Sequence, residues 1–88
     1  MKHLNIQVFG LVQGIFFRTT AKERADKLGL SGFTKNMPNG SVYIEAEGEK
    51  DRLDKFLTWC WKGPSMAQVE KVEITEDTLK NFKEFNIK

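Results

Sequence analysis

The order of its periodic segments is the feature that most constrains how this chain can fold. Apolar residues recur at helical spacing from about Arg18 to Leu28 and again in a segment that ends at Lys62-Gly63-Pro64. Polar and apolar residues alternate, as in strands, over residues 2–9, 30–35, 41–47, 69–75 and 85–87. Strand, helix, strand, strand, helix, strand is the order of the split βαβ plan. The sequence therefore predicts an α+β fold, a ferredoxin-like sandwich over residues 1–88 in which an antiparallel sheet carries two helices on one face.

The apolar positions of each segment indicate which side chains face the core. In the strands they are Leu4, Ile6 and Val8, then Val42, Ile44 and Ala46, then Val72 and Ile74. In the helices they are Phe17, Ala21, Ala25 and Leu28, then Leu53, Phe56, Leu57, Cys60 and Trp61. Only one of Trp59 and Trp61 can point fully inward. On the polar sides of the strands we expect His3 at a surface or edge position, and Tyr43, Glu45 and Glu47 on the open side of the sheet.

Asn39-Gly40 lies between the second and third predicted strands. Both residues tolerate positive φ, so the pair predicts a hairpin that makes these strands antiparallel neighbours. Right-handed crossovers then place the first strand inside the sheet. The loop after that strand is therefore expected to open at the end of a central strand.

Charge and cysteine content exclude several classes of protein. A formal net charge of +2 over 88 residues implies neither a nucleic-acid partner nor a membrane partner. No apolar stretch approaches the ~18 residues of a membrane span. Cys60 is the only cysteine, so the chain has neither an internal disulfide nor a multi-cysteine metal site, and a cytoplasmic location is expected. With no obvious apolar stripe left exposed, we expect a monomer.

The stretch from Gly10 to Arg18 joins the first predicted strand to the first predicted helix. Its glycines, Gly10 and Gly14, allow backbone conformations in which successive amides converge with the first free N–H groups of the helix. A place where several N–H groups converge attracts anions. The guanidinium of Arg18 can add two charge-assisted hydrogen bonds to phosphate or carboxylate oxygens bound there. On its own, a loop of this kind is more often a structural turn with a solvated arginine.

Asn36 closes the second predicted strand, just before the Asn39-Gly40 turn. A carboxamide both donates and accepts hydrogen bonds, so it can hold a water molecule in a fixed orientation. An asparagine beside a hairpin more often caps or turns the chain. The sequence offers no carboxylate pair, Ser-His-Asp set or Cys-His pair as an alternative centre.

Two sets of residues resemble the signatures of the acylphosphatase family. The first comprises Gly10, Val12, Gln13, Gly14, Ile15, Phe17 and Arg18, and the second comprises Gly32, Phe33, Lys35, Asn36, Gly40, Val42 and Gly48. The similarity extends over the whole chain, including the helix between the signatures and Gly63-Pro64. It departs mildly at Thr34, where a small apolar residue is usual, and at Asn39, where aspartate is common; Thr34 is expected to loosen the core slightly.

The resemblance implies a hydrolase that cleaves the carboxyl–phosphate bond of acylphosphates without metal, cofactor or phosphoenzyme. Arg18 and Asn36 would be its catalytic residues, with Asn36 positioning the attacking water. The phosphoryl group would be bound by Arg18 and by the backbone amides of Leu11, Val12, Gln13, Gly14, Ile15, Phe16 and Phe17. A small acylphosphate is the expected substrate, and inorganic phosphate the expected product and inhibitor. The sequence leaves open whether Phe16 shapes the mouth of the site or packs against its rim.

Two other functions are alternatives to this one. An RNA-binding ferredoxin-like module would carry basic and aromatic residues on its third strand, where Glu45 and Glu47 here would repel phosphates. A non-catalytic phosphate-binding or anion-binding regulatory domain, like the acylphosphatase-like domains inside larger maturation enzymes, would keep the loop without the chemistry. Retention of both Arg18 and Asn36 favours the enzyme.

Overall fold

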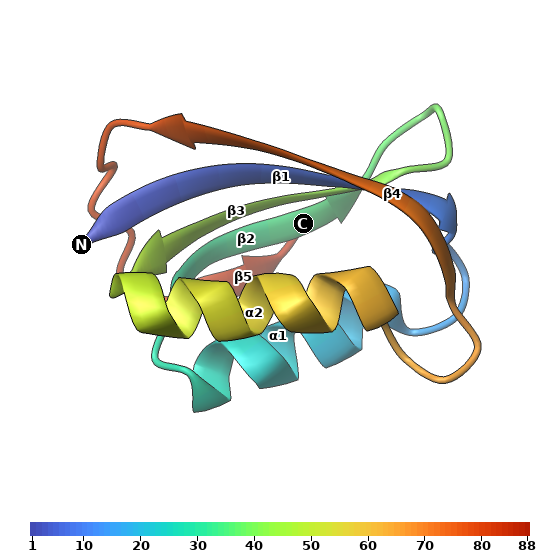
Figure 1. Ribbon diagram of the computed structural model, residues 1–88, viewed down its shortest axis with the longest axis horizontal. Coiled ribbons are helices and arrows are strands. Elements are labelled where there is room, and N and C mark those ends of the chain that lie inside the picture. The colour runs from blue at the N-terminus through green and yellow to red at the C-terminus, as the bar shows by residue number, and fades with distance from the viewer.

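The computed structural model describes residues 1–88 as a five-stranded sheet covered on one face by two helices (Figure 1). In chain order the elements are β1 (Lys2–Leu11), α1 (Phe17–Lys27), β2 (Ser31–Asn36), β3 (Val42–Gly48), α2 (Lys50–Lys62), β4 (Gln68–Asp77) and β5 (Phe85–Ile87). The strands lie in the order β4-β1-β3-β2-β5, so β1 is interior as expected. The ferredoxin-like α+β prediction is confirmed. The sheet is mixed rather than antiparallel throughout, because β5 pairs in parallel with β2.

The core lies between the sheet and the two helices. Its centre is β3, where Val42, Ile44 and Ala46 are completely buried, as predicted. Phe17 of α1 packs on Trp59 of α2 with ring centroids 5.1 Å apart. This contact joins the two helices to each other. Burying an aromatic side chain of this size stabilises a fold by about 1.5–3 kcal/mol. Neither helix has the length or apolar character needed to cross a bilayer.

Two side chains that were expected to be buried, those of Trp61 and Ile74, are exposed. Trp59 is buried and Trp61 is 52% exposed. The reason is helical spacing, because Trp59 shares a face with the buried Phe56 three residues earlier, and Trp61 lies on the opposite side. Ile74 is also exposed, although Val72 on the same strand is buried. β4 is an edge strand with one neighbour, so its inward side chains are only partly covered.

Strand register brings the ends of β1 and β2 together. β1 and β2 both pair antiparallel with β3, so they run parallel to each other and their C-terminal ends lie at the same end of the sheet. Val42 of β3 pairs with Val8 on one side and with Asn36 on the other. Residues in register point to the same face of a sheet, so Asn36 lies on the face that carries the helices. The loop after β1 is at this same end of the molecule (Figure 1).

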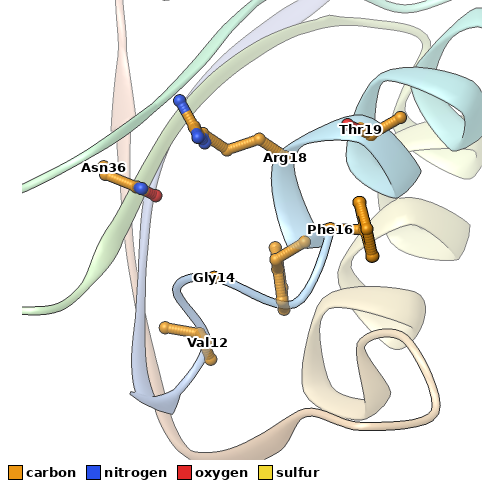
Figure 2. A pocket seen from close by; sticks show the side chains of 7 residues that line it. Val12, Gly14, Phe16, Arg18, Thr19 and Asn36 are labelled. Atoms are coloured by element: carbon orange, nitrogen blue, oxygen red, sulfur yellow. The ribbon is translucent and has the colours of Figure 1, made fainter.

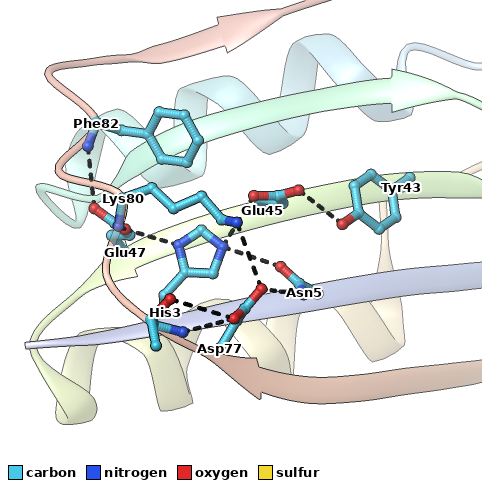
Figure 3. A network of polar contacts seen from close by, with 9 residues as sticks. His3, Asn5, Tyr43, Glu45, Glu47, Asp77, Lys80 and Phe82 are labelled. Atoms are coloured by element: carbon cyan, nitrogen blue, oxygen red, sulfur yellow. Dashed lines mark hydrogen bonds and ion pairs between the residues drawn. The ribbon is translucent and has the colours of Figure 1, made fainter.

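The face of the sheet opposite the helices, called the open face here, carries a network of polar side chains that is covered by another segment of the chain (Figure 3). His3 is completely buried, which corrects the expected surface or edge position. Its Nδ1 lies 2.8 Å from a carboxylate oxygen of Glu47, and its Nε2 lies 2.9 Å from Glu45 Oε1 and 3.0 Å from Asn5 Oδ1. Both ring nitrogens therefore lie within hydrogen-bond distance of side-chain oxygens.

Glu47 is buried as well, because residues 78–84 cross the open face between β4 and β5 and cover it. Its carboxylate accepts the backbone N–H groups of Lys80 and Phe82. Burial opposes ionisation of Glu47, but these amides and the ring of His3 outweigh it and lower the pKa of this carboxyl. Glu47 thus holds the crossing segment on the sheet instead of lying open to solvent as expected.

Two further core positions follow from the sequence. Cys60 is fully buried, and burial raises the pKa of its thiol, in keeping with a small hydrophobic side chain. Thr34 is also fully buried, and its hydroxyl has no hydrogen-bond partner. An unpaired buried hydroxyl is destabilising, in the direction expected for this departure from the family pattern.

Candidate active site

A cavity of about 220 Å³ lies where the end of β1, the start of α1 and the end of β2 meet (Figure 2). It is lined by Val12, Gly14, Phe16, Phe17, Arg18, Thr19 and Asn36. Six of these seven were predicted as site residues, and they come from two segments joined by the pairing of β1 and β2 to β3. The cavity therefore depends on the register of the sheet as much as on the loop itself.

Two glycines shape the loop that forms one wall of the cavity. Gly10 has φ 130° beside an irregularity in the pairing of β1 with β4, and a Cβ there would collide with the carbonyl oxygen of Gln68. Gly14 has φ 75° with open space around it, so its requirement is the backbone conformation alone. Gly10 lets the loop leave the sheet close to β4, and Gly14 turns it back towards α1.

The loop and the first turn of α1 present free hydrogen-bond donors. No backbone hydrogen bond outside the helices and strands is donated by residues 12–16. α1 begins at Phe17 with neither a side-chain cap nor an acidic residue in its first turn. The partial positive charge of the helix terminus is therefore not offset by a side chain. This arrangement suits an anion, which can accept several amide hydrogen bonds at once.

Arg18 and Asn36 face one another across the cavity in Figure 2. Arg18 forms no ion pair, and its single hydrogen bond is a long one of 3.4 Å from Nη1 to the carbonyl oxygen of Lys88. The carboxamide of Asn36 makes no hydrogen bond to the protein, which leaves its donor and its acceptor both available. A positive fork and a neutral amide thus share one cavity with the free amides of the loop.

Three predicted loop residues do not line the cavity. Leu11 is the last residue of β1, where it pairs with Gln68, and its side chain is exposed. Ile15 packs against the hydrophobic core. Gln13 turns its side chain towards the hairpin between β2 and β3.

The Gln13 carboxamide braces the loop against that hairpin. Its Nε2 donates to the carbonyl oxygens of Met37 and Ser41, both at 2.9 Å. Met37 follows Asn36 directly, so the brace connects the wall that carries Arg18 to the strand end that carries Asn36. Gln13 therefore helps to set the distance between those two side chains.

Thr19 lines the cavity and was missed by the sequence reasoning. A threonine in the first turn of a helix is common and carries no signal by itself; its place one residue after Arg18 could have suggested it. The structure contains no cluster of three or more His, Cys, Asp or Glu side chains that could hold a metal ion.

Comparison with known proteins gives consistent matches. The acylphosphatase family model matches residues 4–87. The acylphosphatase of Thermotoga maritima is 43% identical over 100% of this chain and 98% of its own length. The crystal structure of acylphosphatase from Bacillus subtilis superposes with a TM-score of 0.96 at 35% identity, covering 99% of this chain and 98% of that one. Full-length HypF in its phosphate- and nucleotide-bound form matches with a TM-score of 0.88 at 29% identity, covering 98% of this chain and 11% of that one.

Proposed function

This chain belongs to the acylphosphatase family and is a hydrolase, and from that premise we propose that it cleaves the carboxyl–phosphate bond of acylphosphates. The products are a carboxylate and inorganic phosphate. The proposal includes the whole of residues 1–88 as one catalytic domain. The observation that carries it is the shared cavity, because Arg18, Asn36 and the loop amides border the same space.

In this proposal Arg18 and the loop amides bind the phosphoryl group. Phosphoryl transfer spreads negative charge over three equatorial oxygens, so the main requirement is a set of fixed donors around them. The free N–H groups of residues 12–16 and the uncapped start of α1 supply such donors. The guanidinium of Arg18 adds two parallel N–H groups in a fork that matches two phosphate oxygens.

Asn36 positions the water that attacks phosphorus. The water oxygen forms the new P–O bond in line with the departing carboxylate, which leaves with the electron pair of the bond that breaks. The proton released by the water passes to the phosphate product, which is the more basic of the two products. A carboxylate is a good leaving group, so the reaction depends on orientation rather than on a strong acid or base.

The alternative is a phosphate-binding regulatory domain without turnover. Its support is the match to HypF, in which a domain like this chain is a small part of a much longer protein. A binder has no need for Asn36 beside the phosphate cradle. The placement of Asn36 in the cavity with Arg18 therefore favours the enzyme.

Phosphate release from acetyl phosphate, with and without a chelator, tests the proposal. We expect Arg18→Ala to lower kcat at least about 10²- to 10³-fold, the usual cost of one preorganised donor, and Arg18→Lys to recover little because it lacks the fork. Asn36→Ala is expected to abolish turnover while phosphate still binds as a competitive inhibitor.

Matched controls are Arg24→Ala on the same helix and Asn86→Ala on β5, two exposed residues outside the cavity. Both should keep the activity of the unchanged chain. Turnover that survives in Asn36→Ala would remove the water-positioning role. Phosphate binding without any release by the unchanged chain would favour the regulatory domain.

A further inference from the structure

Phe16 has a backbone conformation that its side chain disfavours. It lies at the boundary of α1 with φ 63° and ψ 23°, in the left-handed region. The other non-glycine residue with positive φ is Asn81, a residue type that tolerates this region. For a bulky aromatic residue the conformation is strained, and such strain concentrates at functional sites. Glycine would adopt the same backbone conformation without strain, so the presence of a phenylalanine here points to a function of its ring.

The ring of Phe16 does not contribute to the packing of the core. The Phe16 side chain is 79% exposed, whereas Phe17 beside it is buried against Trp59. Phe16 contributes to the fold through its backbone, because its carbonyl oxygen accepts the N–H of Thr20 at 3.0 Å and the Thr20 hydroxyl at 2.9 Å. Any residue at this position would accept those two bonds.

The position of Phe16 relative to Asn36 suggests what the ring does. Phe16 borders the same cavity as Arg18 and Asn36, and in Figure 2 it lies beside the start of α1, on the side away from Asn36. In-line attack places the leaving group on the far side of phosphorus from the nucleophile. With the water held by Asn36 and the phosphoryl group at the loop, the acyl group therefore extends towards Phe16.

We propose that Phe16 is the acyl-group contact of the site and that it selects acylphosphates with flat apolar, in particular aromatic, acyl groups. This inference rests on the proposed function and adds the substrate class to it. An offset or edge-to-face aromatic pair contributes about 0.5–1.5 kcal/mol beyond the area it buries, which corresponds to a two- to tenfold preference over an acyl group with no ring. The nearby Thr19 leaves this rim partly polar, so small acyl groups are still accepted.

The test is the ratio of kcat/KM for benzoyl phosphate to kcat/KM for acetyl phosphate. We expect Phe16→Gly to lower this ratio about two- to tenfold, and Phe16→Tyr, which keeps a ring, to preserve it. Trp61→Ala is the matched control, because it removes an exposed ring of α2 that does not line the cavity, and it should leave the ratio unchanged. Thermal unfolding provides a second readout. Glycine relieves the backbone strain, so the Tm of Phe16→Gly should not fall below that of the unchanged chain.

Each outcome has a distinct meaning. An unchanged ratio in Phe16→Gly, or an equal loss on both substrates, overturns the inference and leaves the proposed function intact. A Tm several degrees lower would show that the ring is a structural element and would also overturn it. Failure of the unchanged chain to hydrolyse either substrate would overturn the proposed function and this inference together.

Discussion

Replacing Glu47 with glutamine measures how strongly the buried network holds the crossing segment on the sheet. The Glu47 carboxylate accepts three hydrogen bonds, from His3 Nδ1 at 2.8 Å, from the N–H of Lys80 and from the N–H of Phe82 at 3.1 Å. Hydrogen bonds to a charged group contribute about 1.5–3 kcal/mol each. Glutamine keeps one acceptor oxygen and turns an NH₂ group towards a donor, so we expect a loss of roughly 2–4 kcal/mol at pH 7. A chain of this length has a total stability of only about 4–13 kcal/mol.

The loss should depend on pH, because the fold lowers the pKa of Glu47. Burial opposes ionisation, but the amides of Lys80 and Phe82 and the ring of His3 more than offset it. A group with a lowered pKa contributes stability that is present above its unfolded value, about 4.3, and is lost as the pH falls through the folded value. Urea unfolding at pH 7 and at pH 3 measures the free energy of unfolding of the unchanged chain and of Glu47→Gln. The difference between these two free energies should be smaller at pH 3 than at pH 7.

Glu84→Gln is the matched control, because this carboxylate of the same crossing segment is exposed and forms no hydrogen bond or ion pair. It should unfold like the unchanged chain at both pH values. His3 is near the start of β1, and the cavity lies beyond the other end of this strand, about 25 Å away at the rise of a strand. Glu47→Gln should therefore keep its turnover under conditions in which it is folded. A loss under 1 kcal/mol at pH 7, or an equal loss at both pH values, would refute this reasoning.

Two further predictions concern the core and the loop. Thr34→Val removes a buried hydroxyl that has no partner, so it should stabilise the fold by about 1–2 kcal/mol and raise the Tm by roughly 4–8 °C per kcal/mol, as measured by calorimetry. Thr58→Val is its control, because that exposed hydroxyl bonds to a carbonyl oxygen, and an equal rise in Tm there would contradict the explanation. Gln13→Ala removes the brace between the loop and the hairpin, and a misplacement of about 1 Å can cost 10²-fold in rate. We therefore expect kcat on acetyl phosphate to fall roughly 10- to 100-fold, and an unchanged kcat would show that the brace does not position Asn36.

The fold could be predicted from the sequence wherever one physical rule governs a segment. Alternation identified β1 and β3, and the Asn39-Gly40 pair identified the hairpin between β2 and β3. The errors arose where two rules compete. Trp59 and Trp61 are equally apolar, so only the exact angle around α2 decides which is buried. Ile74 lies on the correct side of its strand, but its burial depends on β4 being an edge, which composition does not reveal.

His3 and Glu47 were misjudged for a different reason. Both belong to the polar side of their strands, and alternation predicts that such residues meet solvent. They are buried because residues 78–84 cross the open face to bring β5 beside β2. That crossing pairs residues more than thirty positions apart, and no local pattern records it. A buried polar pair of this kind could be predicted only with the strand order already known.

Most of the cavity lining could be predicted because the loop and Asn36 carry family signatures, whereas the geometry that joins them could not. The pairing of Val42 with both Val8 and Asn36 brings the two signatures together, and that pairing is a property of the assembled sheet. Thr19 was missed because its signal is position alone. Gln13 was predicted through its amide, but its side chain, turned towards the hairpin, makes the contacts that the structure adds.

The two ends of the sheet have opposite roles in the energetics of this fold. At the cavity end the backbone of Phe16 is strained, which costs about 1–3 kcal/mol, and the free amides of the loop leave donors without partners. At the other end Glu47 accepts charge-assisted hydrogen bonds, including one from His3, that stabilise the fold. Because the net free energy of unfolding of such a chain is only a few kcal/mol, a site with backbone strain and unpaired amides is tolerated only where other contacts offset its cost. Because the two sites share no contact, their effects should add, so urea unfolding should show Glu47→Gln combined with Phe16→Gly to be more stable than Glu47→Gln alone by the strain that Phe16→Gly removes.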